Sequence, residues 1–197
     1  MKIEDAGKYT EECSGSDVLT PAQRRLVMSR IKAKHSKPEV VMRRGLHNRG
    51  LRYRLHSNTV PGRPDMVFPK YHTVIFVNGC FWHGHGCSLF KWPKTRADFW
   101  RTKINQNIDR DRKALAALKA DGWCVLVVWE CALKGKRKRD LPAVLTKAES
   151  FIRYSGQSFA EITEYESTDS WASRMRPAKM QFAGARSRTS KQSNGAS

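Results

Sequence analysis

The strongest constraint on how this chain can fold is a stretch of ten residues, Asn78 to Cys87, with the sequence NGCFWHGHGC. It holds two cysteines and two histidines, and Cys131 follows an apolar run later in the chain. Thiolate and imidazole at this density are typical of tetrahedral zinc. Cys80, His85, Cys87 and Cys131 would give four ligands and no open position, so the predicted site is structural. It would pin the loop after one strand to the end of another.

Two alternatives to this ligand set remain open. His83 competes with His85 as the nitrogen ligand, because both lie between Cys80 and Cys87. In the second alternative there is no zinc, Cys80 and Cys131 are small core residues, and His85 is a surface imidazole.

The charge of the chain points to a polyanionic partner. Its 197 residues include 37 Lys+Arg against 18 Asp+Glu, for a net charge of +19 and a pI of about 10.2. Such a surplus favours nucleic acid, because neutralising phosphates releases counterions. No apolar run is long enough to cross a membrane, and the N-terminus lacks the apolar segment of a signal peptide. We therefore expect a cytoplasmic protein with no membrane partner and with reduced cysteines.

The order of apolar and amphipathic segments predicts an α/β fold. Capping signals at Thr20 and Ser36 start two helices, of which the second ends at Gly50. Further helices are expected over 95–122 and 141–154, and strands over 51–56, 66–68, 73–77 and 123–129. We expect a flexible leader over 1–19, one domain over 20–155 and a disordered basic tail over 156–197.

Candidate catalytic groups flank the cysteine-rich stretch. Asp65 ends the rigid turn VPGRPD at the start of a predicted strand, where a carboxylate can bind Mg²⁺, although aspartate beside glycine and proline is commonly turn chemistry. His83 could act as general base or acid, or be a zinc ligand or a surface histidine. Glu39 in a first helical turn is either a helix cap or a second acid.

The adjacent aromatics Phe81 and Trp82 are unusual on a short loop. Such rings can stack on bases or wedge a base step open, whereas the alternative is a small core around the metal. We favour nucleic-acid contact for Trp82, and the two interpretations compete closely for Phe81. The basic run over 134–139 could face phosphates or solvent.

Several long motifs resemble one family of proteins. They are PGRPD at 61–65, VIFVNGCFWH at 74–83, DFW at 98–100 and VVWECAL at 127–133. Over residues 20–155 the chain resembles the very-short-patch-repair DNA mismatch endonucleases. The resemblance implies a restriction-endonuclease-like mixed sheet flanked by helices, with a structural zinc. It also implies a Mg²⁺-dependent nick on the 5′ side of the thymine in T:G mismatches that arise from deamination of 5-methylcytosine.

Residue roles follow from matching positions. The resemblance makes Asp65 the Mg²⁺ ligand together with the main-chain carbonyl of Val77, His83 the catalytic histidine, and Glu39 a supporting acid. It repeats the zinc ligands proposed above. The residues that it implies intercalate into DNA are Phe81, Trp82, Trp100 and Met28.

Two positions depart from the family pattern. Asn78 stands where the best-known pattern has histidine, and an asparagine cannot transfer protons at neutral pH. Val77 replaces a threonine, but a main-chain ligand survives that change. The resemblance implies a partner, double-stranded DNA with a T:G mismatch, and leaves open contacts with mismatch-repair proteins. We expect a monomer, because one nick needs one site.

Two rival functions remain at this point. One is a restriction-type endonuclease that cuts matched DNA, and the other is a zinc-stabilised DNA-binding protein without catalysis. Incubation with Mg²⁺ and matched or T:G-mismatched duplexes separates all three.

Overall fold

A five-stranded mixed sheet forms the centre of the molecule. The computed structural model describes residues 20, 22, 23, 25, 26, 35–154 and 156–165. The strands are adjacent in chain order: β1 (Arg54–Leu55), β2 (Met66–Phe68), β3 (Thr73–Asn78), β4 (Cys124–Trp129) and β5 (Phe159–Ile162). The pairs β1–β2 and β2–β3 are antiparallel, and β3–β4 and β4–β5 are parallel. The predicted α/β class with a mixed sheet is confirmed.

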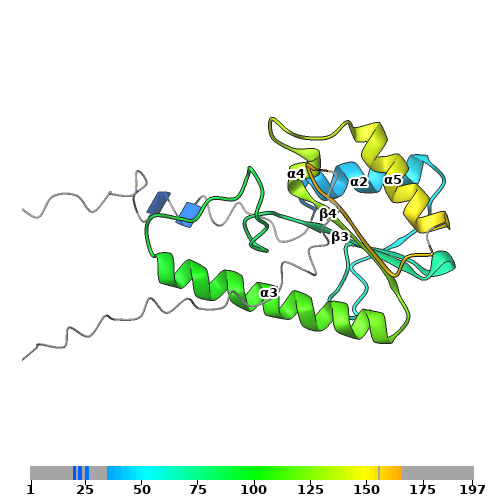
Figure 1. The fold of residues 1–197 in the computed structure, drawn as a ribbon, viewed down its shortest axis with the longest axis horizontal. Helices are drawn as coiled ribbons and strands as arrows, with labels where there is room; N and C mark the ends of the chain where they lie inside the picture. Colours follow the sequence, from blue (N-terminus) through cyan, green and yellow to red (C-terminus); the bar gives the residue numbers. More distant parts are fainter. Residues whose placement is uncertain (1–19, 21, 24, 27–34, 155, 166–197) are drawn as a thin grey trace, which may run out of the picture.

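Helices cover both faces of this sheet. They are α2 (Lys37–Asn48), the short 3-10 helix η1 (Pro69–Tyr71), α3 (Ala97–Ala120), α4 (Glu130–Leu133) and α5 (Leu141–Tyr154). Parallel neighbours need a crossover connection, which α3 supplies between β3 and β4, and α5 between β4 and β5. Helices α2 and α5 lie on one face and α3 on the other (Figure 1).

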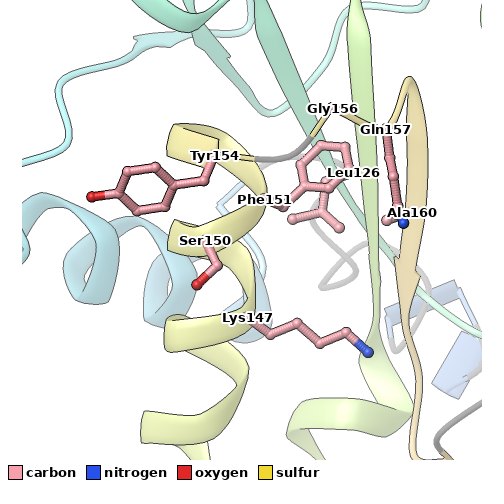
Figure 2. Close-up of a pocket in the computed structure, with 8 residues that line it drawn as sticks. All are labelled: Leu126, Lys147, Ser150, Phe151, Tyr154, Gly156, Gln157 and Ala160. Atoms are coloured by element: carbon pink, nitrogen blue, oxygen red, sulfur yellow. The ribbon is translucent and has the colours of Figure 1, made fainter.

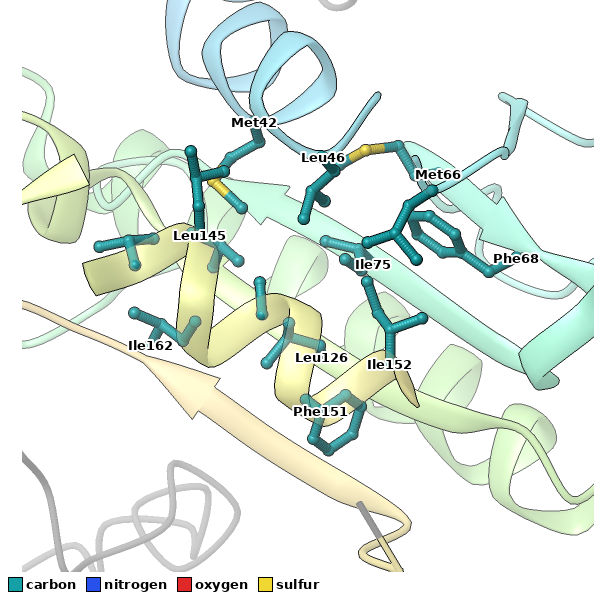
Figure 3. Close-up of a cluster of buried hydrophobic side chains, with 14 of the residues drawn as sticks. Met42, Leu46, Met66, Phe68, Ile75, Leu126, Leu145, Phe151, Ile152 and Ile162 are labelled. Atoms are coloured by element: carbon teal, nitrogen blue, oxygen red, sulfur yellow. The ribbon is translucent and has the colours of Figure 1, made fainter. Parts of the chain in front are cut away.

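Strand alternation divides the core into two layers. Ile75 of β3 and Leu126 of β4 join the layer under α2 and α5, where Leu46 and Phe151 pack (Figure 3). Neighbouring strand residues such as Val74, Val125 and Val127 face the other way and pack with Leu118 of α3. Both faces of β3 and β4 are therefore apolar, which explains why their sequences are continuous apolar runs.

The start of α2 forms as its sequence predicts. The Ser36 hydroxyl accepts from the Glu39 main-chain N–H at 3.4 Å, and the Glu39 carboxylate accepts from the Ser36 N–H at 3.2 Å. Two of the orphan donors of the first helical turn are thus satisfied. The capping box also fixes Glu39 in a buried position.

Strand β5 corrects the expected domain boundary. It lies within the segment expected to be a disordered tail from residue 156, yet it pairs with β4 and buries Ile162. The folded domain therefore includes residues 156–165. The expected strand over 51–56 is present only as β1. The leader over 1–19, most of the first predicted helix and the tail over 166–197 fall outside the described residues. Within the described part of the chain, no helix is long and apolar enough to span a bilayer.

Candidate active site and metal centre

The turn before β2 is shaped to place Asp65. The Arg63 N–H donates to the Val60 carbonyl at 3.2 Å, and Gly62 has a φ of 76°. A Cβ at Gly62 would lie 2.7 Å from the Cβ of Ala114 on α3. Only glycine fits both the conformation and this close approach. The turn therefore packs closely against α3 and places Asp65 beside the end of β3.

The carboxylate of Asp65 is held beside the end of β3. Its Oδ2 accepts a hydrogen bond from the Val77 main-chain N–H at 2.7 Å. Burial raises the pKa of Asp65, and the hydrogen bond from the Val77 N–H, followed by electrostatic interactions with His56, Arg43 and His83, opposes that rise. A partly buried carboxylate beside a strand's main chain is the oxygen-rich setting that Mg²⁺ prefers. The structure thus brings Asp65 and Val77 together, as required for them to share a cation.

His83 is oriented by an aspartate that the sequence analysis did not identify. Its Nδ1 lies 2.5 Å from Oδ2 of Asp111, on α3. When Nδ1 carries the proton and donates to this carboxylate, the lone pair of Nε2 is available to accept a proton. The side chain of His83 is half-buried and lies near Asp65.

One face of α3 contacts three successive residues of the loop, Trp82, His83 and Gly84. Asn107 donates to the Trp82 carbonyl at 2.9 Å, and a Cβ on Gly84 would lie 3.0 Å from Ile104. Positions i, i+3, i+4 and i+7 share a helix face. This face comprises Ile104, Asn107, Ile108 and Asp111. The helical spacing was therefore the available signal for Asp111.

A buried guanidinium interacts electrostatically with Asp65. Glu39 forms an ion pair with Arg43, whose guanidinium nitrogens lie 2.7 Å from His35 Nδ1 and 2.7 Å from His56 Nε2. The donor atoms of His35, Glu39 and His56 are close enough to hold a metal ion. Arg43 already supplies a cation that bonds to all three, so we interpret this group as a guanidinium site. Glu39 is both a helix cap and part of this charged cluster.

Asn78 ends β3, next to Val77. It is buried and lies opposite Trp129 in the parallel register with β4. Val77 packs toward the α2 and α5 layer, so by strand alternation Asn78 points to the α3 side. Its place is close to the candidate catalytic groups, and its role stays a prediction.

The four predicted zinc ligands converge in space. The ligand atoms of Cys80, His85, Cys87 and Cys131 all lie within 4.8 Å of one another. All four cysteines in the described part of the chain are free. His83 is absent from this group, and its ring pairs with Asp111 instead. Three thiols and an imidazole at this separation suit a closed tetrahedral zinc site.

Hydrogen bonds within this cluster shift the pKa values of its thiols. The pKa of Cys131 is lowered to about 5, first by the hydrogen bond that the Cys80 thiol donates to it and then by the nearby His85 ring. The same hydrogen bond, together with burial, raises the pKa of Cys80. Within the cluster a proton is thus shared between sulfur atoms, and a bound metal would replace that proton.

Strand β4 and the chain around β5 support the metal cluster from outside. The Trp129 indole stacks on the His85 ring, with centroids 4.1 Å apart, and its Nε1 donates to Glu161 at 2.9 Å. Glu164 accepts from the N–H and hydroxyl of Ser88 at 2.8 and 2.5 Å. These partners fix a ligand ring and the residue after Cys87, as outer-shell groups do at metal centres.

The predicted wedge residues form one aromatic cluster. The ring centroids of Phe81 lie 5.3 Å from Trp82 and 5.2 Å from Trp100, and those of the two tryptophans are 6.0 Å apart. All three rings are half-buried. Met28 lies outside the described residues, so its placement is not tested.

A pocket of about 370 Å³ lies elsewhere, between α5 and the strands β4 and β5 (Figure 2). Phe151, Tyr154 and Ala160 are among its lining residues. None of the candidate catalytic, metal or wedge residues lines it, so it is separate from the site.

The sheet, the turn that presents Asp65 and the sulfur-rich cluster define a restriction-endonuclease-like α/β domain with a candidate metal centre. A sequence model described as DNA mismatch endonuclease Vsr matches residues 16–89.

Full-length relatives extend this match. The chain is 42% identical over 143 residues to the "DNA mismatch endonuclease Vsr" of Escherichia coli, covering 73% of this chain and 92% of that protein. It is 49% identical over 118 residues to the "Type II nicking enzyme V.XorIIP" of Xanthomonas oryzae pv. oryzae, covering 60% of this chain and 87% of that protein. The "Type II nicking enzyme V.NmeAIP" of Neisseria meningitidis is 46% identical over 121 residues, covering 61% of this chain and 86% of that protein. The chain belongs to the Vsr family of DNA mismatch endonucleases.

Proposed function

We propose that this protein nicks double-stranded DNA on the 5′ side of the thymine in a T:G mismatch, by Mg²⁺-dependent hydrolysis. Its family membership identifies a DNA endonuclease. The observation that carries the proposed chemistry is the arrangement of Asp65 beside Val77, with the His83–Asp111 pair nearby.

Asp65 and the main-chain carbonyl of Val77 would hold Mg²⁺. When bound, this ion would supply positive charge for the phosphate oxygens in the transition state. Arg43, fixed by Glu39 and His56, contributes a second positive charge near Asp65. A phosphate is an anion, so these cations favour its approach to a site that also contains a carboxylate.

His83 is the proposed general base. Asp111 accepts from Nδ1 and holds the ring so that Nε2 can remove a proton from water. An aspartate in this position also stabilises the imidazolium that forms. Replacing Asp111 with asparagine should therefore lower the nicking rate even though His83 is unchanged.

The aromatic cluster supports recognition of a mismatch rather than of a base sequence alone. Phe81, Trp82 and Trp100 are proposed to enter a base step and unstack it, at a cost of a few kcal/mol. This cost is smaller where pairing is already weak, so the wedge favours a mismatch. Met28 is proposed to act from the opposite groove. The net charge of +19 supports affinity for the phosphate backbone.

Zinc at Cys80, His85, Cys87 and Cys131 is proposed to be structural. Four protein ligands leave no position for substrate. The site joins the loop that carries His83 to the start of α4, where Cys131 lies. Its role is therefore to hold the loop in place.

The deciding experiment compares nicking of T:G-mismatched and matched duplexes that share one flanking sequence. We expect a strand-specific nick only in the mismatched duplex, only with Mg²⁺, and none after chelation. Cutting of matched DNA would favour a restriction-type enzyme. Binding without cutting, in zinc-loaded protein with Mg²⁺, would favour a DNA-binding module without catalysis.

Assembly and partners are part of the same proposal. One active site suffices for one nick, so we propose a monomer, which size-exclusion chromatography with light scattering can test. We also propose that the leader over 1–19 and the basic tail over 166–197 are dispensable for nicking. Any contact with mismatch-repair proteins would follow the nick.

A further inference from the structure

The aromatic cluster continues beyond the three proposed wedge residues. Phe90 lies against Phe81, with centroids 6.3 Å apart, and Trp92 meets Phe90 edge-to-face at 5.0 Å. Trp92 is 51% exposed, whereas Phe81, Phe90 and the two wedge tryptophans are half-buried. The outer end of the cluster is therefore an indole that the described part of the protein leaves largely in solvent.

The surroundings of Trp92 are cationic. Lys91, Lys94 and Arg96 are exposed on the same connection, and the sequence has no acidic residue between Asp65 and Asp98. Exposed aromatic rings interleaved with cations form the usual platform for a nucleic-acid strand, because bases stack on the rings while phosphates meet the charges. A second copy of this chain is disfavoured as the partner by like charge.

The connection that carries Trp92 is anchored at its start. The Phe90 N–H donates to the Cys87 carbonyl at 3.1 Å, and Glu164 holds Ser88. The connection from β3 and the first half of α3 extend past the sheet on one side of the molecule (Figure 1). Trp92 is thus held near the metal cluster on the part of the molecule that carries the wedge rings.

We propose that Trp92 is a further DNA-contacting residue, whose indole stacks on a base beside the step opened by the wedge. This contact rests on the proposed function in one respect, that the DNA is opened at a mismatch. Phe81, Trp82 and Trp100 enter the step, and Trp92 contacts the strand next to it. Lys91 and Lys94 contact the flanking phosphates without reading sequence.

The test measures binding of the full-length, zinc-loaded protein to a labelled T:G duplex and to its matched counterpart, at one salt concentration and with chelated Mg²⁺. For Trp92→Ala we expect the Kd for the mismatched duplex to rise roughly 5- to 150-fold, the range that corresponds to one lost stacking contact. The matched duplex should lose less. Trp92→Phe should retain most of the affinity, because a smaller ring can still stack.

Tyr154→Ala is the matched control, since it removes an exposed aromatic from α5, away from the wedge. Its Kd values should match those of the unaltered protein, and the melting temperature of each variant checks folding. A Kd for Trp92→Ala within twofold of the original, or equal losses on both duplexes, would overturn the proposal. The proposal would also be overturned if Trp92→Ala bound DNA as the unaltered protein does but lost binding to anionic vesicles. These assays measure binding and do not involve nicking. If the unaltered protein failed to nick T:G DNA, the proposed function would be refuted, but the binding test of Trp92 could still be read on its own.

Discussion

Glu164 should stabilise the metal centre although it binds no metal. It lies just beyond β5 and holds Ser88, the residue after Cys87, through two hydrogen bonds. Its main-chain N–H also points at Cys131 and helps to lower the pKa of that thiol. Glu164→Ala would leave the Ser88 N–H and hydroxyl without their acceptor while the main-chain contact to Cys131 survives.

The size of the effect follows from the bonds removed. A hydrogen bond to a charged group contributes about 1.5–3 kcal/mol to stability. Two are lost, but water can replace part of each at this edge of the domain, so we expect a total loss of about 2 kcal/mol. In a domain of this size that corresponds to a fall of about 4–8 °C in Tm. If the same interaction is broken when zinc leaves, release should be roughly 30-fold faster.

Zinc release can be followed with a colorimetric chelator, and Tm by calorimetry on zinc-loaded protein. Glu149→Ala is the matched control: it also loses two hydrogen bonds, from Arg49 and Arg153, but it lies on α5 and its bonds are made away from the metal loop. We expect this control to keep the original release rate. Equal release rates and equal Tm values for Glu164→Ala and the unaltered protein would refute the supporting role of Glu164.

Three further changes test other parts of the account. Asp65→Asn should abolish nicking and leave binding to T:G DNA nearly unchanged, because it removes a proposed Mg²⁺ ligand but few DNA contacts; a near-normal nicking rate would exclude the ligand role. Truncation after Tyr154 should yield protein that does not retain zinc, because it removes β5 and Glu164, whereas truncation after Tyr165 should retain it, as metal analysis can show. Hydrogen bonds from Arg49 and then Arg153 lower the pKa of Glu149, so its stabilisation is present above the unfolded pKa of about 4.3 and is lost as the pH falls through the lower folded value. Denaturation of Glu149→Gln should therefore show a deficit of about 0.5 kcal/mol at pH 7 that disappears in acid.

Much of the fold could be predicted because its signals are local. The capping box at Ser36 and the apolar runs of β3 and β4 each act within a few residues, and all three elements form as expected. The cysteine-rich stretch also predicted a metal cluster, since a small loop with several soft ligands has few other uses. The structure brings these ligand atoms together with Cys131, which lies far along the chain.

The features that the sequence did not reveal depend on distant contacts. Helical spacing places Asp111 on one face of a long charged helix, but its pairing with His83 depends on how α3 crosses the sheet. The role of Arg43 likewise could not be predicted, because it depends on contacts with His35 and His56 that only the fold brings together. The short strand β5 has only four residues and is flanked by polar segments, so its apolar pattern is too short to predict a strand. Its pairing with β4 is a parallel contact that no local pattern encodes.

The geometry of α3 explains why recognition and chemistry should depend on each other. One face of this helix holds the Trp82 main chain through Asn107 and the His83 ring through Asp111. These two contacts are four residues apart, about one helical turn, so the helix fixes the wedge and the base as a single unit. A ring that enters DNA pushes on the loop between them. Gly84 packs tightly on Ile104, so the loop has little room to yield without also displacing His83. The proposed wedge therefore cannot shift independently of the proposed base, and DNA that does not admit the wedge should also fail to align with His83.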